Sequence, residues 1–161
     1  MIERDTSQIT KVLRDNGLRV TAARCAVLEW LGEHPHATVD ETCAGVRERL
    51  GSISKQAVYG VLSICSDAGL VRQIRPDGHP ARFERRIGDN HHHLICRNCG
   101  RIEDTDCNAK LRPCLTPDRD HGFDIDEAEV MFWGLCDACK HEPINPDAGA
   151  NRARNTKENR S

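Results

Sequence analysis

The sequence predicts an α+β fold in two parts, with helices in the first half and strands in the second. Three observations lead to this prediction. Apolar residues recur at helical spacing in four segments before residue 70, each bounded by a capping residue or a glycine. Short apolar runs separated by turn residues follow from residue 70 onward. Two Cys-x-x-Cys pairs enclose much of the second half and indicate a small domain folded around a metal ion.

The four predicted helices have clear start and stop signals. The first covers residues 6–16. Thr21 and Ser54 are the expected N-caps of the second and fourth helices, and Thr38 with Glu41 forms a capping box before the third. The glycines at which the helices are expected to end are Gly17, Gly32, Gly51 and Gly69.

A β-hairpin is predicted after the fourth helix. Leu70–Ile74 and Ala81–Glu84 have the composition of strands, and Pro76-Asp77-Gly78 forms a turn between them. Helices closed by a hairpin are the pattern of a winged helix-turn-helix, whose last helix before the hairpin enters the major groove of DNA. Residues 54–68 take that place here, so residues 1–86 are predicted to be a winged-helix DNA-binding domain.

The predicted recognition helix exposes side chains that suit DNA. Lys55 can meet a phosphate, Gln56 can pair with adenine, and Tyr59 can reach a phosphate or a thymine methyl group. Arg19 and Arg24 add positive charge at the second helix. A solvated helix face has similar residue types, so residue types alone leave both interpretations open.

The second half is predicted to be a smaller domain of residues 91–141. Residues 87–90 are polar and serve as a hinge, while residues 142–161 have almost no apolar side chains and form a disordered tail. Any helix between residues 105 and 122 is short, because prolines interrupt it. The predicted strands are residues 93–96, 101–104, 123–125 and 128–135.

Cys96, Cys99, Cys136 and Cys139 are predicted to bind a structural Zn²⁺ ion, because four thiolates close a tetrahedral site. An iron-sulfur cluster and a redox dithiol are the alternatives. The remaining cysteines divide into two groups. Cys25, Cys43 and Cys65 are expected in the helical core, whereas Cys107 and Cys114 are either oxidisable surface thiols or ordinary half-buried residues.

Residues 91–93 form a run of three histidines. In a strand, His91 and His93 share one face and His92 points away. The candidate partners for these imidazoles are Glu84, Asp104 and His36. Nitrogen and oxygen donors suit Fe²⁺ or Mn²⁺ better than the thiolate site does. A solvated polar run is the alternative.

The distribution of charge favours different partners for the two halves. Residues 1–88 hold 13 Lys/Arg and 11 Asp/Glu, whereas residues 89–145 hold 6 and 12. The first half is therefore the better candidate for a polyanion, and the second for cations. The sequence has no apolar run of membrane-spanning length, and its N-terminus lacks the pattern of a secretory signal, so a cytoplasmic location is expected.

Four segments resemble the Fur family of metal-dependent bacterial transcriptional repressors. Residues 17–24 resemble the entry to its second helix, residues 36–41 its metal-bearing third helix, and residues 57–59 its recognition helix. The most specific signature is His91-His92-His93-Leu94-Ile95-Cys96 with Cys99, and the resemblance extends from Gly17 to Cys139.

This resemblance implies a homodimer that binds double-stranded operator DNA and uses its second domain for dimerisation. It also implies one regulatory Fe²⁺ or Mn²⁺ ion that clamps the two domains into a DNA-binding shape. The implied ligands of that ion are His36, Glu84, His91, His93 and Asp104.

Two departures from the family pattern bear on this expectation. Gly60 stands where many members carry Arg, which affects the expected DNA contacts, and Ala128 stands where many carry a metal-binding His. A variant of that additional metal site has as candidates His92, His121, Glu127 and Glu129.

Within the family, the chain resembles the peroxide-sensing branch of the actinobacterial FurA and CatR type, which controls catalase genes. Asp104, where others have Glu, and the segment Trp133-Gly134-Leu135-Cys136 favour that branch, whereas Glu84 argues for an iron- or zinc-responsive uptake regulator.

An enzyme is not expected, because the Cys-x-x-Cys pairs lack the βαβ context of a thiol oxidoreductase. A zinc-stabilised protein-interaction module is a further alternative.

Overall fold

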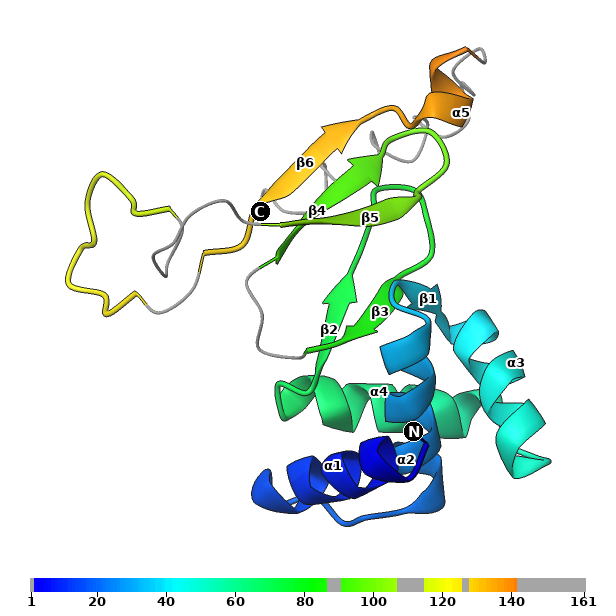
Figure 1. Cartoon of the computed structure of the whole chain (residues 1–161). Coiled ribbons are helices and arrows are strands. Elements are labelled where there is room, and N and C mark those ends of the chain that lie inside the picture. The colour runs from blue at the N-terminus through cyan, green and yellow to red at the C-terminus, as the bar shows by residue number, and fades with distance from the viewer. Residues whose placement is uncertain (1, 87–90, 107–114, 126–127, 142–161) are drawn as a thin grey trace, which may run out of the picture. The chain divides into compact units, whose positions relative to one another are not determined.

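The computed structural model describes residues 2–86, 91–106, 115–125 and 128–141 (Figure 1). The chain divides into two compact units, Met1–Arg75 with Pro80–Ile87 and Pro76–His79 with Gly88–Ser161. Helices dominate the first unit and strands the second, which confirms the predicted α+β class. The predicted hinge and tail lie outside the described residues, as do Cys107, Cys114 and Glu127, and the domain boundaries stay a prediction.

The helices of the first unit begin where the sequence predicts, apart from the first. They are α1 (Ile2–Asp15), α2 (Ala22–Glu33), α3 (Val39–Leu50) and α4 (Lys55–Asp67). The Thr21 and Ser54 side chains accept backbone N–H bonds at 3.3 Å and 3.1 Å, and the capping box of Thr38 with Glu41 is complete. These contacts satisfy donors that a helix start leaves unpaired.

Gly32 does not end the second helix as predicted, because α2 continues to Glu33. A Cβ atom at residue 32 would lie 2.9 Å from Cζ of Arg85. The glycine therefore allows the guanidinium group of Arg85 on β3 to approach the helix. Gly32 serves this close contact and does not end the helix.

A three-stranded sheet completes the first unit. The hairpin strands are β2 (Val71–Ile74) and β3 (Arg82–Arg85), and β1 (Ala37–Thr38) pairs antiparallel with β3, giving the order β1-β3-β2. The hairpin was predicted, but β1 was not, because two residues are too few to show a strand period.

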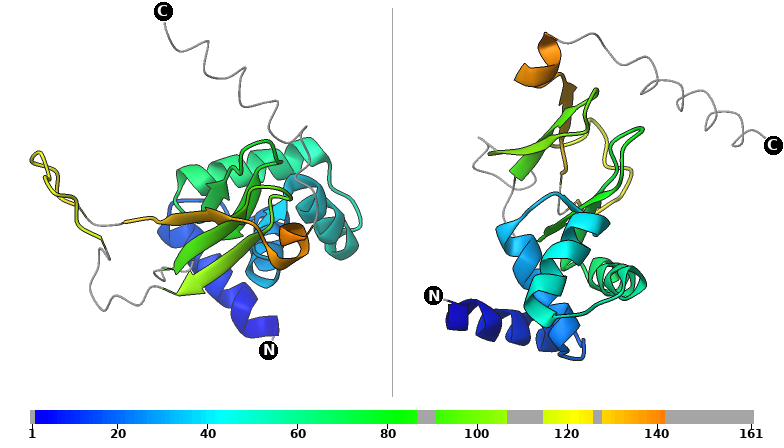
Figure 2. Two further views of the ribbon diagram at one scale, coloured as in Figure 1. Left: turned by 90° about the horizontal axis from the view of Figure 1, so that it is seen from above. Right: turned by 90° about the vertical axis from the view of Figure 1, so that its right-hand side faces the viewer.

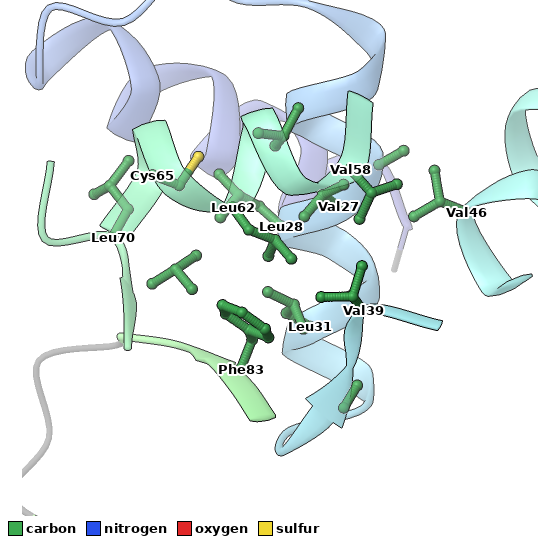
Figure 3. Close-up of a cluster of buried hydrophobic side chains, with 14 of the residues drawn as sticks. Val27, Leu28, Leu31, Val39, Val46, Val58, Leu62, Cys65, Leu70 and Phe83 are labelled. Atoms are coloured by element: carbon green, nitrogen blue, oxygen red, sulfur yellow. The ribbon is translucent and has the colours of Figure 1, made fainter. Parts of the chain in front are cut away.

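One hydrophobic core holds the helices to this sheet (Figure 3). Leu28 and Leu31 of α2 pack with Leu62 of α4 and Phe83 of β3, and all four are buried. Cys43 and Cys65 are buried in this core and Cys25 is half-buried beside it, as the sequence predicts.

The second unit is a three-stranded sheet followed by a short helix. Its elements are β4 (His91–Cys96), β5 (Ile102–Asp106), β6 (Met131–Gly134) and α5 (Asp137–Lys140). Strand β4 lies between the other two, antiparallel to β5 and parallel to β6 (Figure 2).

Two strand predictions in the second unit were wrong in extent. Residues 123–125 form no strand, and the last strand covers only Met131–Gly134 of the predicted 128–135. Strand propensity alone does not make a strand without a partner, and Phe123 stays 75% exposed after a turn at His121 and Gly122. Among the described residues, no helix is long and apolar enough to cross a membrane.

Candidate metal centres and the family of the chain

The four predicted zinc ligands lie together in the second unit. Cys96 ends β4, Cys99 lies in the turn after it, Cys136 caps α5 and Cys139 lies within α5. One sulfur from each lies within 4.8 Å of the other three. Gly100, with φ of +68°, closes the turn that carries the first pair.

These sulfurs fit a Zn²⁺ ion. A tetrahedral site with Zn–S bonds of about 2.3 Å requires sulfurs about 3.8 Å apart. The Sγ atoms of Cys99 and Cys136 are 3.7 Å apart. The Cys136 N–H also donates to Sγ of Cys96 at 3.4 Å, a contact that favours a thiolate.

Two of the four thiols, Cys96 and Cys139, have opposed tendencies to ionise. Burial opposes ionisation of Cys96, but backbone N–H groups of Cys136, Cys99 and Asn98 outweigh it and lower the pKa of this thiol to about 6. A hydrogen bond with Asn98 favours the Cys139 thiolate, yet burial and the neighbouring cysteines raise the pKa of Cys139 to about 12. Four adjacent thiolates therefore need a cation among them, which is the requirement that Zn²⁺ meets.

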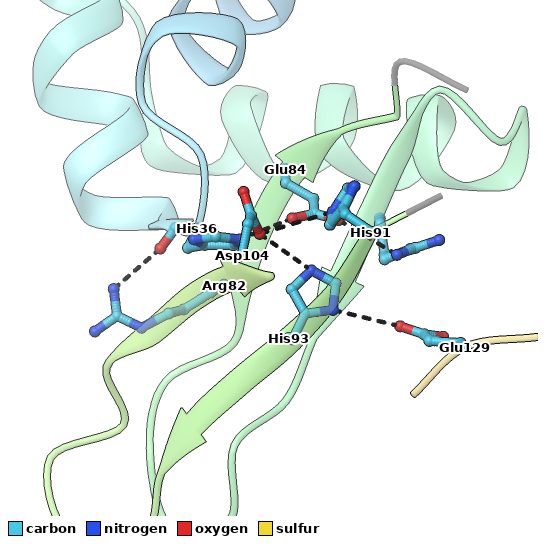
Figure 4. A network of polar contacts seen from close by, with 8 residues as sticks. His36, Arg82, Glu84, His91, His93, Asp104 and Glu129 are labelled. Carbon is cyan, nitrogen blue, oxygen red and sulfur yellow. Dashed lines mark hydrogen bonds and ion pairs between the residues drawn. The ribbon is translucent and has the colours of Figure 1, made fainter. Parts of the chain in front are cut away.

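A buried imidazole and carboxylate pair lies in the first unit. His36 Nε2 is 2.9 Å from Oε2 of Glu84, whose side chain is only 3% exposed, and Arg72 approaches the other oxygen at 3.6 Å. His36 has a φ of +60°, and Arg82 donates a hydrogen bond to its carbonyl oxygen at 3.0 Å. The close-up in Figure 4 includes this contact.

A second group of imidazoles and carboxylates lies in the second unit. Nε2 of His91 and Nε2 of His93 are each 3.7 Å from Oδ1 of Asp104, across the β4–β5 pair. The prediction that His91 and His93 share a face of the strand is thus confirmed. His92 points away, is buried, and meets the Phe132 ring edge-on with 6.4 Å between centroids.

Glu129 lies beside His93, although the sequence suggested it for a different metal site. Glu129 Oε1 lies 3.9 Å from Nδ1 of His93 (Figure 4). The sequence suggested Glu129 for an additional metal site with His92 and His121. No cluster containing His92 or His121 is found among the residues that the structure describes. Glu129 is 36 residues from His93, and only the pairing of β4 with the chain before β6 brings them together.

The predicted DNA contacts lie on the first unit. Lys55, Gln56 and Tyr59 are exposed on α4, and Lys55 pairs with Asp40 at 2.6 Å. The hydrogen bond with Asp40 raises the pKa of Lys55, so this side chain stays cationic. Arg19 is exposed and its carbonyl accepts a hydrogen bond from the half-buried Arg24 at 2.5 Å. The role of these residues in DNA binding stays a prediction.

The fold and the donor sets define a class of protein: a winged-helix regulator that binds metal. The sequence profile of the ferric uptake regulator family matches residues 15–133. The chain belongs to this family, whose members are metal-responsive transcriptional regulators and not enzymes. The predicted resemblance is thereby confirmed.

Known relatives agree with this assignment. The transcriptional regulator FurA of Mycobacterium tuberculosis is 53% identical over 127 residues, which cover 79% of this chain and 86% of FurA. The solved peroxide stress regulator of Campylobacter jejuni is 25% identical, with a TM-score of 0.62, over 83% of this chain and 97% of that one. The ferric uptake regulator of Helicobacter pylori, 17% identical with a TM-score of 0.65 over 88% and 95%, supports the fold alone.

Proposed function

We propose that this protein is a metal-dependent repressor that senses peroxide through a regulatory Fe²⁺ or Mn²⁺ site and controls oxidative-stress genes of the catalase type. The observation that carries the proposal is the convergence of His91 and His93 on Asp104. Two imidazoles and a carboxylate are donors that suit Fe²⁺ and Mn²⁺. They are chemically distinct from the four thiolates, which supply the structural Zn²⁺ site.

The remaining ligands of the proposed site come from the first unit. His36 and Glu84 are already paired there, and the family resemblance assigns them to the same ion as His91, His93 and Asp104. An ion bound by ligands from both units stabilises the arrangement in which all five meet, by its difference in affinity between arrangements. We infer that this arrangement is the one that binds operator DNA.

The peroxide response depends on imidazoles beside the bound metal. Bound Fe²⁺ would reduce H₂O₂ and supply an oxidant at the site, whereas Mn²⁺ would not. His36 or His91 would gain an oxygen atom and lose its capacity to coordinate. The protein would then release both the metal and the operator. The names of its relatives, FurA and a peroxide stress regulator, support this branch, as does Asp104.

The same arrangement supports a second candidate, an iron- or zinc-responsive uptake regulator. Glu84 favours it, because the resemblance to peroxide sensors predicts Asp at that position. In that case the operator would be released when the metal dissociates, and no side chain would change. A further version of peroxide sensing places the oxidation on the zinc thiols Cys96 and Cys99, or on Cys107 and Cys114, with loss of zinc.

We further propose that the protein acts as a homodimer on operator DNA, and therefore in the cytoplasm. Leu94 and Phe132, on the neighbouring strands β4 and β6, are 46% and 49% exposed. They line an apolar groove of about 360 Å³ on the second unit. Exposed apolar surface of this kind is typical of a protein interface, and a second copy is the partner that the family resemblance favours.

One experiment separates these candidates. The zinc-loaded protein is titrated with Mn²⁺ or Fe²⁺ while operator binding is followed by fluorescence anisotropy, and H₂O₂ is then added. Peroxide sensing predicts that the iron form leaves DNA, that the manganese form stays bound, and that mass spectrometry finds an added oxygen on His36 or His91. Release with every histidine intact would contradict this version, and release with oxidised cysteines and lost zinc would support the thiol version.

A further inference from the structure

We propose that Glu129 is a positioning residue for His93. Its carboxylate faces Nδ1 of the imidazole and so orients Nε2 toward Asp104 as the metal-binding nitrogen. This inference rests on the proposed regulatory role of His93. It assigns Glu129 to the outer shell of that site, instead of to an additional metal site.

The two nitrogens of His93 face different carboxylates. Nδ1 lies 3.9 Å from Oε1 of Glu129, and Nε2 lies 3.7 Å from Oδ1 of Asp104. The imidazole itself is fully buried. An imidazole that binds a metal through one nitrogen carries its N–H on the other, so the carboxylate that faces this N–H orients the ring for the metal.

The position of His91 shows which nitrogen that is. Nε2 of His91 also lies 3.7 Å from Oδ1 of Asp104. Two bare nitrogens and a carboxylate oxygen can share one metal ion on that side of the strand. The opposite nitrogen of His93, Nδ1, is therefore the one available to donate to Glu129. A carboxylate that accepts the second N–H of a ligating histidine is the usual outer-shell partner in metal sites.

The backbone fixes Glu129 in this place. The N–H of His93 donates to the carbonyl of Val130 at 3.2 Å, and His93 is paired with Met131 in the β4–β6 ladder. Val130, the residue next to Glu129, is thus hydrogen-bonded through its backbone to His93. The 3.9 Å separation is an ion-pair distance, longer than a direct hydrogen bond. A hydrogen bond between the two groups therefore requires a bridging water or a small turn of the Glu129 side chain.

The first test needs no regulatory metal. Two-bond ¹H–¹⁵N correlation spectra of zinc-loaded protein with labelled histidine report which nitrogen of His93 carries the proton. We expect E129A to have less proton on Nδ1 of His93 than the wild type, because the carboxylate that accepts this N–H is gone. E129Q should resemble the wild type, because the glutamine oxygen also accepts a hydrogen bond. The control is E103A, which removes an exposed carboxylate of strand β5 that pairs with Arg101.

The second test measures Mn²⁺ affinity. Loss of an outer-shell partner weakens metal binding by about 10- to 100-fold, so we expect this loss in E129A, a smaller one in E129Q and none in E103A. An unchanged tautomer and unchanged affinity in E129A would overturn the proposal. So would equal, much larger losses in E129A and E129Q, since these would make Glu129 a direct ligand.

The two tests also separate this proposal from the proposed function. If the wild type binds no Mn²⁺ beyond the zinc site, the regulatory function fails. The tautomer of His93, measured without that metal, still reports whether Glu129 positions the ring.

Discussion

His36 has a backbone conformation that few residues other than glycine adopt. Its φ of +60° lies in the left-handed region, and its side chain is nevertheless buried against Glu84. Such a conformation persists only where surrounding contacts impose it, and it is frequent at functional sites. The Arg82 hydrogen bond to the His36 carbonyl is one of those contacts.

We expect R82A to loosen His36. The substitution removes the bond to the His36 carbonyl and the 3.8 Å ion pair with Glu41. Because Arg82 is partly exposed, the expected loss of stability is about 1 kcal/mol, measured by urea unfolding. Under the proposed function, Mn²⁺ affinity should fall as well. R75A, which removes an exposed arginine of the same hairpin, should change neither quantity, and equal effects of the two would contradict a specific role for Arg82.

Some residues of the two metal sites could be predicted from the sequence, and others could not. The shared face of His91 and His93 follows from strand alternation, a purely local rule. The four zinc ligands follow from cysteine spacing. The contact of Glu129 with His93 depends on a parallel strand pair between distant segments, and neither residue's neighbours in the sequence carry a signal for it.

At the scale of elements, helices α2 and α3 meet at a glycine. A Cβ atom at Gly45 would lie 2.2 Å from Cζ3 of Trp30. The Trp30 ring also stacks on His34, with 3.7 Å between centroids, and lies 5.7 Å from the Arg49 guanidinium carbon. Because these contacts hold the indole on several sides, moving it aside would cost free energy.

We therefore expect G45A to destabilise the protein. Overpacking costs about 1–3 kcal/mol, and the better helix propensity of alanine offsets up to about 1 kcal/mol of this. G60A is the matched control, because Gly60 lies in α4 and a Cβ atom added there would have no neighbouring atom within 4 Å. G60A should stabilise by about 0.5–1 kcal/mol. Thermal unfolding measures both, and a G45A protein as stable as G60A would contradict the packing argument.

The capping box of α3 gives a pH dependence. The Glu41 carboxylate accepts hydrogen bonds from the Thr38 N–H at 2.7 Å and from its hydroxyl at 2.8 Å. The backbone bond is the main reason that the pKa of Glu41 lies below its ordinary value. Because its pKa is lower in the folded state, the Glu41 carboxylate stabilises the fold fully at pH values above the unfolded-state pKa. This stabilisation is lost as the pH falls through the folded-state value.

The expected difference in free energy of unfolding between wild type and E41A has this pH dependence. It should be present at about pH 7, stay below about 1 kcal/mol because Glu41 is exposed, and shrink toward about pH 3. Urea unfolding at both pH values measures it. E48A, at an exposed position of the same helix, is the control. A difference that grew on acidification would show that the carboxylate does not cap α3.

At the scale of the whole molecule, the two tryptophans of the chain report on different units. Trp30 lies in the first unit and Trp133 in the second. A W30F background therefore leaves Trp133 as a fluorescent probe of the β5-β4-β6 sheet. Helical circular dichroism reports mainly on the first unit, because four of the five described helices, including all the long ones, lie there.

We expect C136S to lose zinc and to unfold the second unit alone. Cys136 and Cys139 connect α5 to the end of β4, so the site joins segments 37 residues apart. Zinc content and Trp133 fluorescence should change together, with the helical signal retained. C25S, which alters a half-buried thiol outside the site, should retain zinc. A folded second unit in zinc-free C136S would contradict a structural role for the metal.

The architecture of the molecule was predictable to different depths in its two halves. Caps, glycines and the hairpin are local signals, and they located α2 to α4 and strands β2 and β3 closely. The second unit depends on pairing between distant segments, including the parallel pair of β4 with β6. Local pattern therefore misplaced a strand at residues 123–125 and missed α5.

Strand β4 has a consequence for how signals combine. One strand of six residues carries His91 and His93 and ends in the zinc ligand Cys96. Under the proposed function, damage to either donor set would disable the same strand, so the repressor would behave as a logical OR gate for metal-directed and thiol-directed oxidants. Recovery would then require newly synthesised protein in the first case, whereas rereduced thiols and fresh zinc would suffice in the second.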